Sequence, residues 1–326
     1  MGIPITVVSG FLGSGKTTLI NQVLKGTNLA PEEIVIIENE FGEIGIDHEL
    51  LLHSQERIFQ MNGGCICCSL RTDLINALSA VLEVFVDQGY PIKQVIIETS
   101  GISDPQPIMQ TIVTTPRIRS CFYLDSVVTV VDSDHFERNF LYPEAVKQLA
   151  IADRVFISEK SKAGAAKIPK IVQEIKTINP LADFHTFSFS TKQALLADHV
   201  LGIARFNQSL QSIRDVEHHS HEKGHHHQLK HKFGALNLQA PKAIPEKLLL
   251  RWLDWLLINN PDNIFRMKGF IQLAEQEFLT ELQGVNQIIQ FTPTTREAEG
   301  NTLELVVIGQ NLDQTAIHQA FDKIQR

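Results

Sequence analysis

The chain has 326 residues, enough for two domains, and its 43% hydrophobic and 20% charged residues are typical of a globular protein. A net charge of −8 argues against a nucleic-acid partner, because contact with phosphates requires a basic surface. No apolar run has the length of a membrane span, so no membrane partner is expected. The amino-terminal residues lack a basic leader and a cleavage site, which favours a cytoplasmic, reducing location.

The first motif is a glycine-rich loop between a predicted strand and a predicted helix. Residues 10–17 read GFLGSGKT and fit G-x-x-x-x-G-K-[ST] at every position, with a β-branched run at 5–8 and a helical pattern at 17–25. In such a P-loop the backbone N–H groups surround phosphate oxygens, Lys16 reaches the β- and γ-phosphates, and the Thr17 hydroxyl binds Mg²⁺. The motif predicts these nucleotide-binding residues: Gly10, Gly13, Ser14, Gly15, Lys16, Thr17 and Thr18.

Further apolar, β-branched runs follow, with segments between them that can form helices. Nearly continuous apolar strands that alternate with helices indicate a parallel sheet covered on both faces, and hence an α/β domain over residues 1–205. The predicted strands are residues 34–37, 95–97, 127–131 and 154–157.

Polar residues follow three of these strands, where ligands bind in parallel sheets. They are ENEFGE at 38–43, ETSG at 98–101, and Asp132. We expect Glu98 to act through Mg²⁺ or its water and the Gly101 N–H to face a γ-phosphate, so that both join Lys16 and Thr17 as catalytic groups. The alternative role for Glu98 is that of a strand-end carboxylate that caps a helix.

Three of the four cysteines lie together after a Gly-Gly pair, at Cys65, Cys67 and Cys68. Thiolates are soft ligands suited to zinc, copper(I) or iron–sulfur clusters. An extended segment would point Cys65 and Cys67 the same way, whereas a turn would bring all three inward. Three thiols, or two with a carboxylate from residues 38–43, would suffice for zinc; burial as small apolar residues and a redox role are the alternatives. The isolated Cys121 is expected in the core.

A histidine-rich segment at residues 216–231 has no hydrophobic period, which predicts a solvated linker over residues 206–232. Neutral imidazole is the commonest transition-metal ligand, so this linker can collect zinc, nickel or cobalt with low selectivity. A polar spacer without a metal role is the alternative. The secondary metal ligands predicted here are His218, His219, His221, His225, His226, His227 and His231.

Residues 233–326 predict a smaller, compact α+β domain. Trp252 and the other tryptophan are expected in the core, and Arg266 and Lys268 at the surface rather than in an interface. Asp313 is the expected N-cap of the last helix. The predicted strands are residues 233–239, 264–273, 285–291 and 303–309, and the predicted helices are residues 245–259 and 313–324.

Together these motifs resemble the CobW-like metal-handling GTPases, relatives of the HypB and UreG nickel chaperones. The matching segments are GFLGSGKTTL, IENEFGEIGID, NGGCICC, IIETSGISDPQPI and IADRV, with RMKGFI and VVIGQNLD in the carboxyl-terminal domain. The resemblance implies hydrolysis of GTP with Mg²⁺, coupled to binding or delivery of zinc, cobalt or nickel to a client metalloprotein. It also implies that Cys67, with Glu38 and Glu43, lies near an internal metal site; Cys65 and Cys68 complete the set of candidate ligands.

One segment departs from the pattern of guanine-selective NTPases. These carry N-K-x-D or T-K-x-D after the fifth strand, where the aspartate accepts hydrogen bonds from the guanine ring. Here the strand runs into SEKSKAG at 158–164. In one register residues 158–161 take the four places, and sliding by one residue aligns Lys160 with the lysine and puts Lys162 in the aspartate place. Neither register supplies an aspartate. Ser158 and Lys160 are still expected to contact nucleotide, but selectivity for GTP over ATP should be weaker than in an N-K-x-D site.

Two other functions fit parts of the sequence. A small-molecule kinase is compatible with the P-loop alone, and a metal buffer or sensor with a degenerate nucleotide site is compatible with the missing aspartate. A homodimer is one assembly that the resemblance allows.

Overall fold

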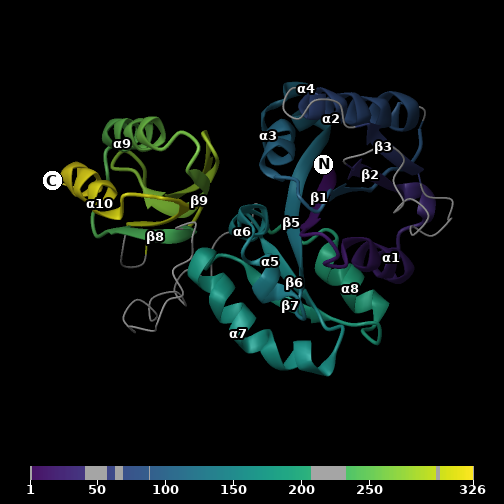
Figure 1. Ribbon diagram of the computed structural model, residues 1–326. Helices are drawn as coiled ribbons and strands as arrows, with labels where there is room; N and C mark the ends of the chain where they lie inside the picture. The colour runs from purple at the N-terminus through teal and green to yellow at the C-terminus, as the bar shows by residue number, and fades with distance from the viewer. Residues whose placement is uncertain are drawn as a thin grey trace. The chain divides into compact units, whose positions relative to one another are not determined.

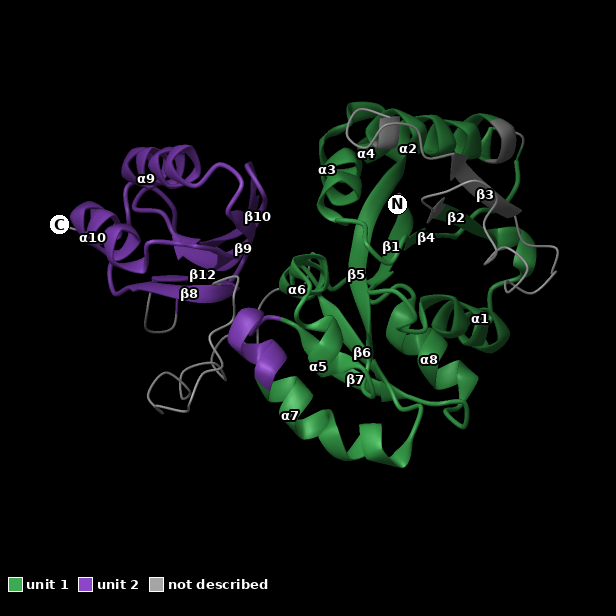
Figure 2. Cartoon of the chain, viewed as in Figure 1, with its two compact units in different colours: residues 1–173, 182–208 green, residues 174–181, 209–326 purple. Residues whose placement is uncertain are grey.

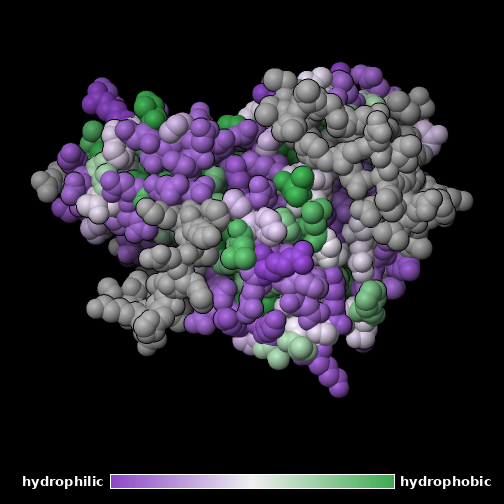
Figure 3. All heavy atoms as spheres, viewed as in Figure 1, coloured by the Kyte–Doolittle hydropathy of each residue, from purple (hydrophilic) through white to green (hydrophobic). Residues whose placement is uncertain are grey.

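The computed structural model describes residues 2–40, 57–62, 69–87, 89–206, 233–298 and 302–325 of the chain. The chain divides into two compact units, residues 1–173 with 182–208, and residues 174–181 with 209–326 (Figure 2). Hydrophilic side chains predominate on the face drawn in Figure 3, where apolar ones are scattered. In the described part of the chain, no helix is long and apolar enough to cross a membrane.

Within the described residues, the first unit is built on a seven-stranded parallel sheet with the strand order β3-β2-β4-β1-β5-β6-β7 (Figure 1). Consecutive residues of the central strands are buried, so both faces of the sheet are covered. This confirms the predicted α/β fold. The strands are β1 (Ile3–Gly10), β2 (Ile34–Glu40), β3 (Arg57–Asn62), β4 (Gln94–Thr99), β5 (Phe122–Asp132), β6 (Arg154–Ser158) and β7 (Asp183–Phe187).

The two edge strands, β3 and β7, were not predicted from the sequence. They read RIFQMN and DFHTF, and β7 is mostly half-buried, so neither carries the continuous apolar run of a central strand. The predicted strands are all present and extend further than the apolar runs, because the polar residues Glu38, Glu98 and Asp132 are still part of β2, β4 and β5.

The helices beside the sheet form groups, and the helices within each group contact one another. α1 packs with α8, and the buried Leu19, Ile20 and Val23 of α1 form one apolar cluster with sheet residues such as Ile36 and Val128, as the sequence period predicts. α2, α3 and α4 form another group (Figure 1). The α-helices are α1 (Lys16–Gly26), α2 (Ser69–Ala80), α3 (Gln106–Thr114), α4 (Pro116–Cys121), α5 (Phe136–Asn139), α6 (Pro143–Ala150), α7 (Lys162–Ile178) and α8 (Gln193–Val200). η1 (Pro31–Glu33) is a 3₁₀ helix, and η3 (Val81–Val86) is a π-helix.

Cys121 was expected in the core but is only partly buried. It is the last residue of α4, directly before β5, and its Sγ atom lies 3.5 Å from the hydroxyl of Ser120. A residue at the junction of a surface helix and a strand retains contact with solvent. The sequence pattern around Cys121 does not reveal this junction.

The described part of the second unit contains a five-stranded antiparallel sheet with the order β11-β10-β9-β12-β8. Its apolar face packs against α9 and α10, where the ring of Trp252 meets Phe321 edge-on at 5.1 Å. This confirms the α+β domain and the buried Trp252. The elements are β8 (Phe233–Ala240), α9 (Glu246–Asn259), β9 (Ile264–Gln272), β10 (Leu279–Val285), β11 (Ile288–Pro293), β12 (Leu303–Gln310) and α10 (Gln314–Ile324).

The predicted strand at 285–291 was wrong in its boundaries. Residue 285 ends β10, which was not predicted, and a turn at Asn286 with φ of 54° leads into β11. Asparagine tolerates this left-handed conformation better than most residues. One apolar run therefore spans two antiparallel strands.

Arg266 and Lys268 were expected at the surface, and this was wrong: their exposed fractions are 2% and 5%. Alternation along β9 places Met267 in the apolar core and turns its two basic neighbours to the opposite face. There Lys268 pairs in register with Gln283 of β10, which donates to Glu281 at 2.8 Å. Burial raises the pKa of Glu281, while the Gln283 hydrogen bond and the Lys268 charge oppose the rise.

Candidate nucleotide site

The loop between β1 and α1 has the backbone geometry of an anion-binding turn. Gly15 caps α1 with φ of 107°, in the left-handed region that favours glycine. A Cβ atom on Gly10 would lie 2.4 Å from the carbonyl oxygen of Val130, so only glycine fits there. The Ser14 N–H donates back to Phe11 O at 3.1 Å and closes the turn. Backbone N–H groups therefore gather at the amino terminus of α1, where anions bind.

Lys16 and Thr17, the first residues of α1, contact the surroundings of this loop. The Lys16 Nζ donates to the carbonyl oxygens of Gly10 at 3.0 Å and Phe11 at 3.5 Å. The Thr17 hydroxyl donates to Glu98 Oε1 on β4 at 2.8 Å, although the two residues are 81 positions apart. A hydroxyl and a carboxylate are ligands that Mg²⁺ accepts, so the chemistry of this pair fits the cation expected with a nucleotide.

Glu38, one of the expected metal ligands, is a neighbour of this pair. In the parallel register of β2 and β4, Glu38 lies opposite Glu98. Its side chain is 6% exposed. Residues paired in register on adjacent strands point to the same face, so both carboxylates lie on one face of the sheet.

The other expected metal ligands lie outside the described residues. These are Glu43, Cys65, Cys67 and Cys68, and the histidines of the linker, His218, His219, His221, His225, His226, His227 and His231. Within the ranges that the structure describes, no three His, Cys, Asp or Glu side chains form a group that could hold a metal ion.

The loop after β4 lies directly against the P-loop. A Cβ atom on Gly101 would be 2.7 Å from the backbone nitrogen of Leu12, so this close approach requires glycine. Gln148 of α6 is 1% exposed, and its Nε2 donates to the carbonyl oxygens of Gly101 at 3.2 Å and Ser103 at 3.0 Å. The sequence did not single out Gln148, because one polar residue on the buried face of an amphipathic helix is not distinguishable by pattern.

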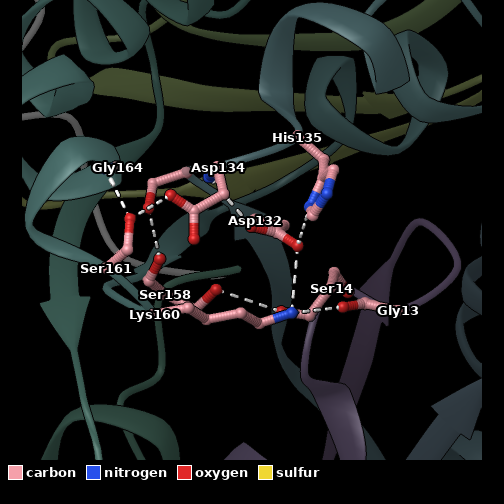
Figure 4. A network of polar contacts seen from close by, with 10 residues as sticks. Gly13, Ser14, Asp132, Asp134, His135, Ser158, Lys160, Ser161 and Gly164 are labelled. Carbon is pink, nitrogen blue, oxygen red and sulfur yellow. Dashed lines mark hydrogen bonds and ion pairs between the residues drawn. The ribbon is translucent and has the colours of Figure 1, made fainter.

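Ser158, the last residue of β6, and Lys160, two residues later, attach β5 and β6 to the P-loop (Figure 4). The Lys160 Nζ donates to Gly13 O at 2.7 Å and to Asp132 Oδ2 at 2.9 Å. The Ser158 hydroxyl donates to Ser14 O at 3.2 Å. The structure thus brings Ser158 and Lys160 to the loop that contains the other predicted nucleotide-binding residues.

Asp132 is ionised in this network. Burial alone would raise its pKa, but hydrogen bonds from His135, Lys160 and the backbone of Asp134 hold the pKa below its ordinary value. The His135 Nδ1 lies 2.9 Å from Asp132 Oδ2 (Figure 4). A carboxylate that stays charged keeps the Lys160 ammonium group in place beside the P-loop.

The start of α7 is joined to the same region. The Ser161 hydroxyl donates to Asp134 Oδ1 at 2.5 Å and accepts from the Gly164 N–H at 3.0 Å (Figure 4). The Ser133 hydroxyl donates to Ser158 O at 2.7 Å. These bonds hold the loops after β5 and β6 together, and none of Ser133, Asp134 and Ser161 was predicted as part of a site.

A hollow of about 290 Å³ opens beside the P-loop. Gly15 and Thr18 of the first turn of α1 line one side, and the loops after β6 and β7 line the other. The predicted residues Thr18, Ser158 and Lys160 meet here. The hollow therefore lies next to the phosphate-binding turn.

Comparison with known proteins places this geometry in a family. The model described as "CobW/HypB/UreG, nucleotide-binding domain" matches residues 4–186, and "Cobalamin synthesis protein cobW C-terminal domain" matches residues 233–325. The chain is 30% identical to zinc chaperone CobW of Pseudomonas aeruginosa, over 97% of this chain and 89% of that protein. It is 27% identical to zinc chaperone YjiA of Escherichia coli over 99% of both chains, and 26% identical to zinc-regulated GTPase metalloprotein activator 1 of Saccharomyces cerevisiae over 98% and 83%.

A solved structure shares the fold. The crystal structure of Zn(II)-bound YjiA GTPase from E. coli superposes with a TM-score of 0.74 and covers 100% of both chains at 22% sequence identity. The two family models together match most of the chain, including the P-loop, the β4 loop and the β6 loop described above. The chain belongs to the CobW/HypB/UreG family.

Proposed function

We propose that this protein hydrolyses GTP and uses the nucleotide cycle to bind zinc, or another divalent transition metal, and deliver it to a client metalloprotein. Curated relatives that align over almost the whole chain are named zinc chaperones, and a further one is named a zinc-regulated GTPase metalloprotein activator. Transfer of the γ-phosphoryl group to water is the reaction, and the metal ion is the cargo.

One observation carries the proposal: Glu98, which accepts a 2.8 Å hydrogen bond from Thr17, is in register with Glu38 on the adjacent strand. Thr17 and Glu98 are assigned to the nucleotide site, and Glu38 is assigned to the site of the transferred metal. If Glu38 ligates the cargo, a change at the phosphates reaches a metal ligand across one strand. Nucleotide state and metal affinity are then linked, and the linkage acts in both directions.

Each residue of the nucleotide site has a role in this proposal. Lys16 stabilises negative charge on the transferring phosphate, and the Gly101 N–H contacts the γ-phosphate. Thr17 and Glu98 would hold Mg²⁺, which neutralises phosphate charge when it is bound. The nucleotide is held by Gly10, Gly13, Ser14, Gly15, Thr18, Ser158 and Lys160.

A different set of residues is proposed to hold the transition metal that the protein delivers. We assign the cargo site to Glu38, Glu43, Cys65, Cys67 and Cys68, and a weaker collecting role to the histidines of residues 206–232. The division into a nucleotide-binding domain at 1–205, this linker and a carboxyl-terminal domain at 233–326 belongs to the same proposal. A cytoplasmic location would keep the clustered thiols reduced and able to ligate metal.

Measured GTP hydrolysis, with and without zinc, tests the proposal. Lys16→Ala should lower the rate by about a hundredfold to a thousandfold, because it removes a charge that stabilises the transferring phosphate. Lys25→Ala is the matched control, since Lys25 is an exposed lysine in the last turn of the same helix. Added zinc should change the rate of the wild-type protein.

Two results would contradict the proposal. Hydrolysis by Lys16→Ala at the wild-type rate would exclude catalysis at this P-loop. A wild-type protein that neither binds zinc nor changes its hydrolysis rate with zinc would exclude the metal-handling role.

A further inference from the structure

The hollow beside the P-loop is placed to receive the base of a nucleotide. Its lining begins at Gly15 and Thr18, where the phosphate-binding turn enters α1. On its other side lie Phe187, at the end of β7, and Phe189, which is 84% exposed. An exposed aromatic ring at the mouth of a hollow offers a stacking surface for a planar base. The loop after β6 completes the lining.

Glu159 is the acidic residue of that loop, and its backbone position is fixed. Its N–H donates to Phe187 O at 2.8 Å. The preceding Ser158 and the following Lys160 each donate to a P-loop carbonyl oxygen, at 3.2 Å and 2.7 Å. Glu159 lines the hollow between these two attachments, so the start of its side chain is held at a set place relative to the phosphates.

A second acceptor faces the same hollow from α1. Gln22 lines it, is 8% exposed, and its Oε1 has no hydrogen-bond partner among the described residues. A buried amide oxygen without a partner is costly, which indicates that a donor outside the described chain completes it. Guanine and ribose both carry such donors.

The chemistry of the two purines distinguishes them at a carboxylate. Guanine presents N1–H and N2–H donors on one edge, and one carboxylate accepts both. Adenine presents an acceptor nitrogen at the same place, which a carboxylate repels. Lys162, the residue in the aspartate place when Lys160 takes the lysine place, can only donate hydrogen bonds.

We propose that Glu159 supplies the guanine-reading carboxylate that the sequence after β6 lacks at the usual position. The inference rests on the proposed function only in that a guanine nucleotide binds the P-loop. Selectivity for GTP then depends on a residue one position before Lys160 rather than two positions after it.

Binding of GDP, XDP and ADP with Mg²⁺, measured by calorimetry without added transition metal, tests the assignment. Xanthine carries an acceptor oxygen where guanine carries its N2 amino group, so a glutamine amide should match xanthine better than guanine. Glu159→Gln should weaken GDP binding by about tenfold to a hundredfold and strengthen XDP binding. ADP binding should not weaken, because the variant removes the carboxylate that repels the adenine acceptor nitrogen. Lys162→Ala is the matched control and should keep the wild-type ratio of GDP to XDP affinity.

Glu159→Ala separates recognition from folding. It should weaken GDP binding without strengthening XDP binding. A gain of XDP binding by Glu159→Gln cannot come from a damaged fold, because damage would weaken the binding of every nucleotide. Three results would overturn the assignment. Glu159→Gln could keep the wild-type ratio of GDP to XDP affinity, Glu159→Gln could weaken the binding of all three nucleotides equally, or Lys162→Ala could change the ratio of GDP to XDP affinity. Tight wild-type binding without preference among the bases would overturn only this inference, whereas no binding of any of the three would overturn the proposed GTP hydrolysis as well.

Discussion

His185 on β7 shows how one side chain takes its properties from several elements. Its ring stacks on Phe156 of β6 at 5.5 Å and lies 4.3 Å from the ring of His199 on α8. Burial and, after it, the charge of the Arg154 guanidinium together lower the pKa of His185 to about 4, although Asp183 opposes the shift. The imidazole is therefore neutral in the folded protein at neutral pH.

A pH dependence of stability follows from this shift. The folded pKa of about 4 lies below the ordinary 6.5, so the unfolded chain binds more protons between these values. The contribution of His185 to the free energy of unfolding should thus be full above pH 6.5 and decline as the pH falls toward 4. Its ring protons, followed by NMR, should titrate near pH 4, and His185→Gln should flatten the decline. A His185 ring that titrates near the ordinary 6.5 would contradict the prediction.

At the scale of elements, α10 is the helix whose start the structure explains most directly. Asp313 precedes it, and its carboxylate accepts the Ala316 N–H at 3.0 Å. This side chain satisfies one of the N–H groups that the first turn leaves without a partner. The helix then packs against α9 through the Trp252–Phe321 contact.

Asp313→Ala should destabilise the carboxyl-terminal unit by about 1 kcal/mol, the typical loss for a removed N-cap. Asp322→Ala is the control, because Asp322 is an exposed acid in the last turn, where a negative charge is unfavourable to the helix. Both tryptophans of the chain lie on α9, so urea unfolding followed by tryptophan fluorescence reports on this unit. Equal losses in the two variants would show that the cap contributes nothing specific.

At the scale of the whole molecule, the proposed function separates a tight metal site from a weak one. Changing Cys65, Cys67 and Cys68 together to serine should abolish the tightest site, because hydroxyls do not replace thiolates as soft ligands. Deleting residues 217–231 should lower the number of metals bound and leave the tightest site intact, since ordering a solvated linker costs conformational entropy at each step. Metal titrations of both variants measure affinity and stoichiometry.

GTP turnover in the same two proteins completes this prediction. Only the triple-serine variant should lose the effect of metal on hydrolysis, because only the thiols are assigned beside the nucleotide. A triple-serine protein that keeps its tight site and its metal response would show that the thiols are not the cargo site, and a redox role would then explain the cluster.

The sequence predicted most reliably what local chemistry dictates. The central strands and α1 follow from apolar runs and their period, and the Asp313 cap follows from one residue type before a helix. β3 and β7 escaped prediction because edge strands need no apolar run. β10 was not predicted, and its last residue was assigned to the predicted strand at 285–291, because a two-residue turn at Asn286 leaves little mark in the pattern.

What the sequence determined by itself was the P-loop, because its chemistry depends on adjacent residues and the glycines can be read in order. Only the tertiary structure decided how the other residues of the site contact this loop and one another. Glu98 reaches Thr17 from 81 positions away, and Gln148 reaches the Gly101 loop from 47. Arg266 and Lys268 are buried although their charges predict exposure. Such contacts depend on strand order and on which face each residue presents in the folded sheet, and both arise from packing between segments far apart in the chain.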